Sequence, residues 1–263
     1  MASWATKRKI LYGGSVIFVV LAIVFIIIFS FFYKAPTCFD NIKNSDEQGI
    51  DCGGSCVKLC QSAFLPLKIS WGGAKFEKIA PRLYNLASYI VNPNTTGGAI
   101  NVPYKFSLFD SKGILIIERT GKVNIGAHRN ILAFLSGVDV SERIPAKAVF
   151  EFTEGPVWFK SSDSLNELII VDKKYEEDDK SSFLNVTFEN KGLKSYRNLI
   201  VGVVLYDENN NAIGFSQTKI DAIYPKTETN NNREIAAFTW PVTRNGKVTS
   251  IEALPIITPE KAP

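Results

Sequence analysis

Hydrophobic and polar positions divide this chain into one long apolar run near the N-terminus and many short apolar runs after it. The stretch SVIFVVLAIVFIIIFSFFY, residues 15–33, contains no charged residue. Together with residues 10–14 it supplies the roughly 20 residues that a helix needs to cross a bilayer. We therefore predict a transmembrane helix over residues 10–33, preceded by a cytoplasmic tail over residues 1–9.

The charges beside the apolar run predict its orientation. Lys7, Arg8 and Lys9 precede the run, and the positive-inside rule places such a cluster in the cytoplasm. The run is longer than the roughly 7–15 apolar residues of a signal peptide, and no A-x-A cleavage site follows it. We expect an uncleaved single-pass anchor in the cell membrane that leaves residues 35–263 outside the cytoplasm, with a cleaved signal peptide as the alternative.

From about residue 65 the apolar runs become short and are separated by Gly, Asn, Asp and Pro. Runs rich in β-branched and aromatic residues between such separators predict β-strands joined by turns. No helical period of useful length follows the membrane segment. The ectodomain is therefore predicted to be all-β, with strands in YKFSLFD, GILIIE, AVFEF, ELIIVD, FLNVTF, NLIVGVVLYD and IAAFTW.

Two parts of this β-rich region resemble each other. YKFSLFDSKGIL at 104–115 resembles VGVVLYDENNNAI at 201–213, so that Phe109 aligns with Tyr206, 97 residues later. A repeat of roughly 100 residues has the size of an immunoglobulin-like sandwich. We predict two tandem immunoglobulin-like β-sandwiches, over residues 65–160 and 165–258. In LIVGVVLYDENNNAIGF we expect alternation that buries one face of a hairpin.

The second copy also resembles a known family. The segment from Asn185 to Glu228 is similar to the FxLYD family of bacterial and archaeal extracytoplasmic β-sandwich domains. The matching features are the N-x-G turn at Asn190–Gly192, the strand ending in LYD at 205–207, and Pro225. The first copy shares only LFD at 108–110 and Lys112-Gly113. The resemblance implies a β-sandwich outside the cytoplasm and names no activity.

All four cysteines lie in one short polar segment, with the spacing C-x13-C-x3-C-x3-C. Outside the cytoplasm such a segment usually forms two disulfides, which replace the core that it lacks. The spacing has neither the paired C-x2-C of zinc ribbons nor the C-x-x-C of redox motifs. We predict a disulfide-stapled module over residues 36–62 and leave its three pairings open. Its cysteines are Cys38, Cys52, Cys56 and Cys60.

The same segment carries side-chain oxygens. Asp40, Asn44, Glu47 and Asp51 offer the hard oxygen ligands that Ca²⁺ prefers. Asx side chains of this kind also cap turns in loops that hold no ion. Both interpretations stay open: a calcium site through these four residues, or a solvated polar loop. No other cofactor is predicted.

The cysteine segment has a resemblance of its own. TCFDNIKNSDEQGIDCGGSCVKLC, residues 37–60, resembles a short motif of bacterial and archaeal surface proteins that often stands beside β-sandwich domains. Here it ends in C-V-K-L-C, one residue longer than is common, and Asn41 stands where glycine is usual. Gly49, Gly53 and Gly54 are expected in turns that need positive φ or a close approach of the backbone. The motif implies a surface location and no activity.

Charge and composition exclude some functions. The N-terminal basic residues and Lys34 account for the whole net charge of +4, so the rest of the chain is neutral. A neutral body without a basic cluster is a poor match for nucleic-acid binding. The single histidine, His128, stands in GAHRN, which is typical of a turn, and no nucleophile lies in a G-x-S-x-G context. We predict that this protein is not an enzyme.

Core packing is the default expectation for Trp158 and the other ectodomain tryptophans. Trp158, in GPVWFKSSD near the boundary between the two predicted sandwiches, is the best candidate among them for an exposed contact with a partner. Together these features predict a membrane-anchored extracytoplasmic protein for binding, adhesion or scaffolding in the cell envelope. Its expected partners are the membrane and another envelope protein, surface protein or glycan. The alternative is an accessory subunit of a membrane secretion or pilus-like complex.

Overall fold

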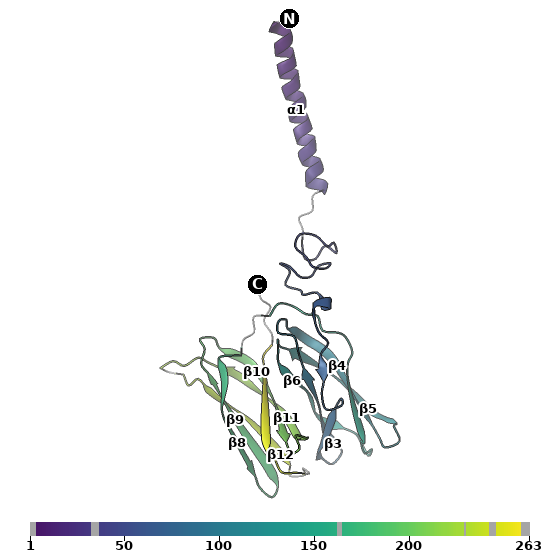
Figure 1. Ribbon diagram of the computed structural model, residues 1–263, viewed down its shortest axis with the longest axis vertical. Helices are drawn as coiled ribbons and strands as arrows, with labels where there is room; N and C mark the ends of the chain where they lie inside the picture. Colours follow the sequence, from purple (N-terminus) through teal and green to yellow (C-terminus); the bar gives the residue numbers. More distant parts are fainter. Residues whose placement is uncertain (1–3, 33–36, 162–164, 229, 242–245, 259–263) are drawn as a thin grey trace. The chain divides into compact units, whose positions relative to one another are not determined.

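The structure is a computed structural model that describes residues 4–32, 37–161, 165–228, 230–241 and 246–258 (Figure 1). These residues form one α-helix, one 3₁₀ turn (Gln61–Ala63) and thirteen strands. By its internal contacts the chain divides into two compact units, residues 1–56 and 57–263. Each unit is described by itself below.

The first unit begins with helix α1, Trp4–Phe32. Its segment Arg8–Ser30 is apolar and long enough to cross a membrane, and no part of it is buried in the described protein. A helix that is apolar on every side needs an apolar surrounding to be stable. The predicted apolar helix is therefore present, and it starts six residues earlier than expected. A helix of this kind serves as a membrane anchor or a signal sequence.

The second unit contains four antiparallel sheets, here numbered sheets 1 to 4. Sheet 1 holds β1 (Lys68–Ile69), β2 (Lys75–Ala80), β3 (Leu83–Val91) and β6 (Asn130–Asp139). Sheet 2 holds β4 (Ala99–Phe109), β5 (Leu115–Ile125) and β7 (Lys147–Phe152). Sheet 3 holds β10 (Tyr196–Tyr206), β11 (Ala212–Ile223) and β13 (Ser250–Ile256). Sheet 4 holds β8 (Leu168–Glu177), β9 (Ser181–Asn190) and β12 (Arg233–Pro241).

The sheets share cores in pairs. Side chains of sheets 1 and 2, among them Leu86, Ile90 and Phe106, form one buried cluster. Side chains of sheets 3 and 4, among them Leu184 and Phe188, form a second. Residues that face a core alternate with outward residues along strands such as β9 and β12, as expected for sheets with one buried face. We call these the first and the second sheet pair.

The two sheet pairs have the same strand order. In sheet 1, β3 lies between β6 and the short strands β1 and β2; in sheet 4, β9 lies between β12 and β8. In sheet 2, β4 lies between β5 and β7; in sheet 3, β10 lies between β11 and β13. Strands β4 and β10 each contain 11 residues and begin at positions 99 and 196, in agreement with the repeat seen in the sequence.

An asparagine shows that the correspondence extends to side chains. The Nδ2 of Asn92, just after β3, donates to the carbonyl of Gly126 at 2.8 Å. The Nδ2 of Asn190, at the end of β9, donates to the carbonyl of Ile223 at 3.3 Å. Each buried amide thereby joins the end of one strand to the end of a strand in the opposite sheet. Buried amides are stable only when they are hydrogen-bonded in this way.

A third cluster joins the two sheet pairs. Outward side chains of sheet 1 pack against outward side chains of sheet 3, among them the buried Leu132, Val204 and Phe215. The four sheets therefore stack in the order 2, 1, 3, 4, and Figure 1 shows the two pairs side by side. Strand β10 is buried on both faces along Val201–Leu205. The expected one-sided burial in LIVGVVL is thus corrected, because sheet 3 has a packed layer on each side.

Candidate functional site

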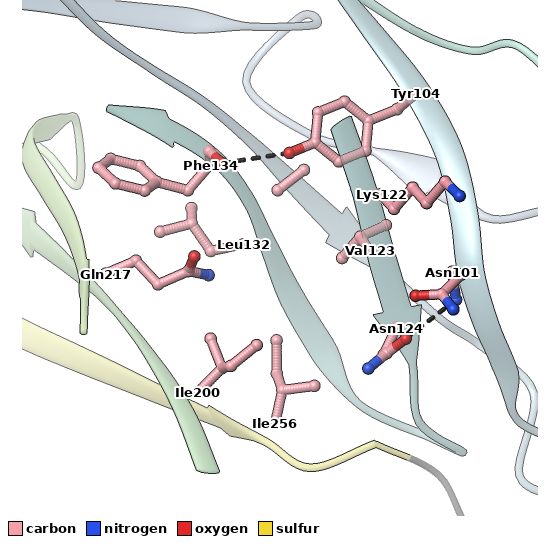
Figure 2. Close-up of a pocket in the computed structure, with 11 residues that line it drawn as sticks. Asn101, Tyr104, Lys122, Val123, Asn124, Leu132, Phe134, Ile200, Gln217 and Ile256 are labelled. Atoms are coloured by element: carbon pink, nitrogen blue, oxygen red, sulfur yellow. Dashed lines mark hydrogen bonds between the residues drawn. The ribbon is translucent and has the colours of Figure 1, made fainter. Parts of the chain in front are cut away.

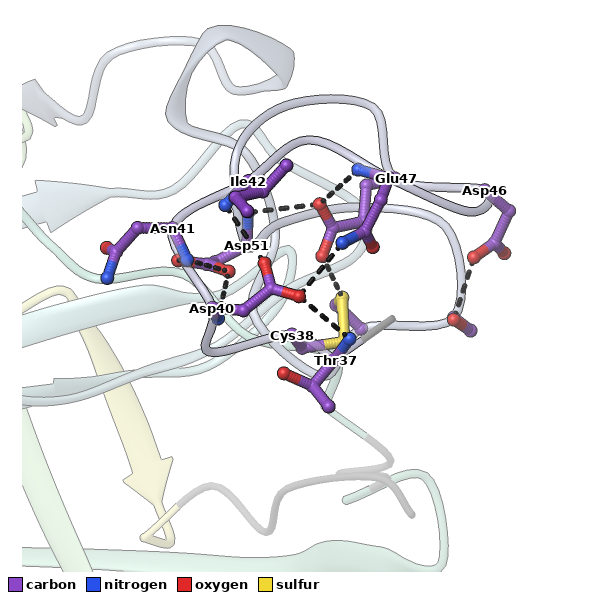
Figure 3. Close-up of a disulfide and its surroundings, with 11 residues drawn as sticks. Thr37, Cys38, Asp40, Asn41, Ile42, Asp46, Glu47 and Asp51 are labelled. Atoms are coloured by element: carbon purple, nitrogen blue, oxygen red, sulfur yellow. Dashed lines mark hydrogen bonds between the residues drawn. A yellow bond between two sulfur atoms is a disulfide. The ribbon is translucent and has the colours of Figure 1, made fainter. Parts of the chain in front are cut away.

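The cysteine module is held by disulfides, one of which Figure 3 shows. Cys38 is bonded to Cys56, with their Cα atoms 5.7 Å apart. Cys52 and Cys60 are also disulfide-bonded, and no cysteine is free. The expectation that all four cysteines are oxidised is therefore met, and the structure selects the pairing that contains Cys38–Cys56.

Two aspartates organise the loop between the first two cysteines. The Asp51 carboxylate accepts hydrogen bonds from the main-chain amides of Asp40 and Asn41, at 3.0 and 3.1 Å. The Asp40 carboxylate accepts from the Ile42 amide at 2.9 Å and from the Asn44 side chain at 2.9 Å. The hydrogen bonds from the Asn44 side chain and from main-chain N–H groups hold the pKa of Asp40 below its usual value, because they stabilise the charged form.

Glu47 is the buried acid of the module. Its Oε2 accepts from the amides of Asn44 and Asp51, each at 3.3 Å, and its Oε1 lies 3.4 Å from Cys56 Sγ. Glu47, Cys38 and Cys56 lie close enough together to suggest a metal site. However, the two sulfurs are bonded to each other, so neither is the thiolate that a metal would require.

The four residues named for calcium do lie in one network, but their carboxylate oxygens face N–H donors. A cation bound to Asp40, Glu47 and Asp51 would have to displace those donors. The Oδ1 of Asn44 is buried and makes no hydrogen bond within the described residues. This geometry matches turn-capping side chains better than a formed ion site. Calcium binding stays a prediction that a titration of the full chain would test.

Left-handed backbone explains several residue types in the module. Asn41 has φ 60°, and Gly53 and Gly54 have φ 78° and 57°. Asparagine is one of the few residues besides glycine that adopt this conformation readily, which accounts for the residue type at position 41. A β-carbon on Gly54 would clash with the Asp46 carbonyl. Gly49 does not have positive φ; it instead forms an antiparallel bridge with Cys52.

The exposed partner contact considered for Trp158 is wrong, and the default expectation of core packing is confirmed. Its side chain is only 1% exposed and belongs to the core of the first sheet pair, where it stacks on Phe64 with ring centroids 4.7 Å apart. A ring buried in this way is not an exposed partner contact. Trp158 lines a cleft of about 370 Å³ together with residues 65–67 and 152–156. Its Nε1 is buried without a hydrogen-bond partner among the described residues.

His128 lies in the turn between β5 and β6, where its φ is 49°. Its side chain is exposed, and its main-chain amide donates to the Asn94 carbonyl at 2.7 Å. The structure therefore places the only imidazole of the chain in a turn, as the GAHRN segment indicated. No carboxylate among the described residues forms a hydrogen bond or an ion pair with it.

A carboxylate with two tyrosines marks the junction between the sheet pairs. Tyr89, on β3, donates its hydroxyl to Glu252 Oε1 at 2.7 Å. Tyr206, on β10, donates to Glu252 Oε2 at 3.0 Å. Burial and the Glu252 charge raise the pKa of both tyrosines well above the usual range, because they disfavour a second negative charge there. Both hydroxyls therefore remain donors, and each oxygen of Glu252 has its own partner.

A second feature of the junction is a groove of about 150 Å³, here called the junction groove (Figure 2). The first sheet pair contributes β4, β5 and β6, and the second contributes β10, β11 and β13. Asn101, Asn124 and Gln217 bring amide groups to it, and Leu132, Ile200 and Ile256 bring apolar surface. The groove exists only because sheets 1 and 3 are stacked.

Sequence reasoning missed the junction residues altogether. Alternation along a strand predicts which side chains face inward, but not which outward face meets another sheet. One signal was present in the sequence. VGVVL at 201–205 contains no polar side chain, which is typical of a strand covered on both faces. The run YNLASYI at 84–90 is equally buried, but Asn85 and Ser88 interrupt its apolar pattern.

Comparisons with known proteins give no family model and no curated protein that matches this chain. A solved structure of red sea bream transglutaminase is similar over 74% of this chain and 29% of its own, at 11% identity and a TM-score of 0.22. A protein described as a beta-galactosidase of Bacteroides fragilis is similar over 73% of this chain and 41% of its own, at 12% identity and a TM-score of 0.19. The chain spans less than half of each, and TM-scores this low support no conclusion about its fold or function.

Proposed function

We propose that this chain is a single-pass membrane protein whose C-terminal region lies outside the cytoplasm and acts by non-catalytic binding, adhesion or scaffolding in the cell envelope. The observation that carries the proposal is an exposed apolar helix followed directly by a disulfide-bonded module. The helix requires a lipid surrounding, and disulfides persist in oxidising compartments outside the cytoplasm. The bilayer would then separate the N-terminus from the cysteines.

We further propose that each sheet pair is an immunoglobulin-like sandwich, the second one of the FxLYD type. The repeated strand order and the two separate cores support this. So does the length of each copy, which is close to the roughly 100 residues of such domains. Tandem sandwiches commonly act in recognition, and packing of their outward faces would fix the distance between two binding surfaces. The partner would be another envelope protein, a surface protein or a glycan.

A topology experiment tests the proposal. The full chain would carry an epitope tag at each end, and intact cells of the source that produce it would be treated with protease. We expect loss of the C-terminal tag and protection of the N-terminal tag until the cells are permeabilised. Replacement of Lys7, Arg8 and Lys9 by glutamine should give a mixed orientation, because the positive charges hold the N-terminus inside. Protection of the C-terminal tag on intact cells would overturn the proposal.

Identification of the partner distinguishes a binding or adhesion protein from an accessory subunit of a larger membrane complex. Crosslinking on intact cells, followed by identification of the crosslinked material, should recover a surface protein or a glycan if the chain acts in adhesion. Recovery of components of a secretion or pilus-like system, in defined proportions, would instead assign it to that assembly.

A further inference from the structure

The junction groove has an apolar floor between polar walls. Leu132 and Ile256, at the floor, are 0% and 4% exposed. The side chain of Gln217 lies across this floor from those of Asn101 and Asn124, as Figure 2 shows. The groove therefore presents carbon surface in its centre and amides on both sides.

Two of these amides are available to a ligand. The Oδ1 of Asn124 accepts from the Asn101 main-chain amide at 2.9 Å, and its Nδ2 donates to Thr258 Oγ1 at 3.2 Å. The side-chain amides of Asn101 and Gln217 make no hydrogen bond to any described residue. Each offers one acceptor and two donors. No aspartate or glutamate is among the described residues that line the groove. The one of these residues with a charged side chain is Lys122, on β5, whose ammonium group is a hydrogen-bond donor only.

The walls are held in place by specific local structure. Asn101 has φ 54° and stands at a register shift of β4 against β5, and such a bulge re-aims a side chain. Tyr104 closes one end of the groove by donating to the Phe134 carbonyl at 3.1 Å, and burial raises its pKa to about 12, so the hydroxyl remains a donor. Any β-carbon on Gly121 would clash with the Tyr104 ring. The glycine is therefore needed for this arrangement.

We propose that the junction groove binds a single residue of a neutral carbohydrate. Sugar hydroxyls both donate and accept hydrogen bonds, and so do the side-chain amides of Asn101 and Gln217. The C–H face of a sugar ring would lie on the apolar floor. The absence of lining carboxylates and the presence of the Lys122 ammonium disfavour a cation as ligand. The ammonium can donate to a sugar hydroxyl, and the comparison with glucuronate tests whether it instead selects an anion. The volume, about 150 Å³, is below the roughly 300–1,000 Å³ of sites for drug-sized ligands, which limits the occupant to one ring. The inference rests on the proposed binding function and assigns it a ligand class.

The test uses the full chain in detergent micelles and ligand-observed saturation-transfer NMR. The probes are methyl glycosides of glucose, galactose and mannose, and N-acetylglucosamine, each at up to about 10 mM, where weak single-ring binding is detectable. Glucuronate and the dipeptide alanylalanine are the acidic and peptide comparisons. We expect at least one neutral saccharide to bind more strongly than both comparisons.

Variants locate the binding. Asn101→Gly removes one amide while keeping a residue that accepts positive φ, and Gln217→Met removes the other with little change in shape. Each should weaken binding about three- to tenfold, as expected for one hydrogen bond. The matched control is Asn210→Gly, which makes the same change at φ 58° in the turn between β10 and β11 and should leave binding unchanged. Thermal unfolding confirms that each variant folds.

Two results would overturn the inference. One is the absence of binding by every neutral saccharide, or a preference for glucuronate or the dipeptide. The other is binding that Asn101→Gly and Gln217→Met leave at the wild-type level. Neither result affects the membrane topology, which the protease experiment decides separately, so failure of the ligand class and failure of the proposed function can be told apart.

Discussion

At the scale of single residues, two buried tryptophans show how hydrogen bonding distinguishes similar positions. Trp158 and Trp240 are each 1% exposed and lie in the cores of the first and second sheet pairs. The Nε1 of Trp240 donates to the Phe215 carbonyl at 3.1 Å. The Nε1 of Trp158 has no such partner among the described residues. A buried donor without an acceptor costs free energy that a bonded donor does not.

Phenylalanine substitutions measure this difference. Trp158→Phe and Trp240→Phe lose a similar volume of ring, but only the second breaks a hydrogen bond. We expect Trp240→Phe to reduce the free energy of unfolding by about 1–3 kcal/mol more than Trp158→Phe. Urea unfolding of the two variants beside wild type gives the comparison. An equal or larger loss for Trp158→Phe would show that its N–H is bonded in solution.

A buried carboxylate on β9 predicts acid sensitivity. Glu189 is 6% exposed, forms an ion pair with Lys191, and lies 2.8 Å from Arg233. The hydrogen bond from Lys191, and then that from Arg233, lower its pKa from 4.5 to about 2. Because its pKa is lower in the folded state, Glu189 stabilises the fold above pH 4.5, and this contribution is lost as the pH falls toward 2.

The variant Glu189→Gln tests the sign of this effect. It should melt at a lower temperature than wild type at pH 6, because two cations lose their partner. The difference in melting temperature between wild type and variant should be smaller at about pH 3, where wild type has lost part of the stabilisation by ionised Glu189. Melting followed by circular dichroism gives both values. A gap that stays constant between the two pH values would assign the effect to packing instead.

At the scale of elements, the cysteine module and the strands obtain stability in different ways. The strands bury continuous cores, whereas most apolar side chains of the module, such as Phe39 and Ile50, are exposed. Its order rests on carboxylates that accept main-chain amides and on covalent links. A disulfide that closes a loop of this size, 18 residues apart in sequence, contributes about 3 kcal/mol to local stability.

Removal of that link should therefore unfold the module and leave the sheets intact. In the double variant Cys38→Ser/Cys56→Ser we expect faster proteolysis within residues 37–56. The melting transition of the β-rich unit should not change, since that unit is compact by itself. Limited proteolysis followed by mass spectrometry locates the cleavage. Unchanged cleavage in the double variant would mean that the hydrogen bonds suffice.

At the scale of the whole β-rich unit, the choice of stacking faces follows from side-chain chemistry. The outward faces of sheets 1 and 3 carry the residues that form the third cluster. The outward face of sheet 2 instead carries Lys105, which pairs with Glu118 and Glu151, each at 2.9 Å. Burial of these charges against another sheet would cost more desolvation free energy than the packing would gain. The stack therefore ends at sheet 2 and does not continue on that side.

The tyrosine–glutamate contact should couple the two sheet pairs. Tyr89→Phe removes a hydrogen bond to a charged acceptor, which contributes about 1.5–3 kcal/mol. The same substitution should cost much less when Glu252 is already alanine, because the hydroxyl then has lost its acceptor. A double-mutant cycle by urea unfolding measures this. The matched control is Tyr84→Phe, which lies in the first core and should add independently to Glu252→Ala.

Alkaline pH gives a second measure of the same contact. The pKa values of Tyr89 and Tyr206 are raised above the ordinary 10.0. The two tyrosines therefore make their full contribution to the free energy of unfolding below pH 10. This contribution falls as the pH rises further, because the unfolded chain then releases protons that the folded chain retains. Simple additivity of Tyr89→Phe and Glu252→Ala in the cycle would contradict the coupling.

The sequence by itself determined the apolar helix, the oxidised cysteines, the β-rich body and its internal repeat. Each of these depends on local pattern: a run without charge, cysteines in a polar segment, and alternation between turns. Tertiary structure alone decided that Cys38 pairs with Cys56, that Trp158 is buried, and that sheets 1 and 3 stack to form the tyrosine–glutamate contact and the junction groove. Those features join residues as far apart as Tyr89 and Glu252. Alternation along a strand does not show which other sheet an outward side chain will contact. These contacts follow only from the packing of whole sheets.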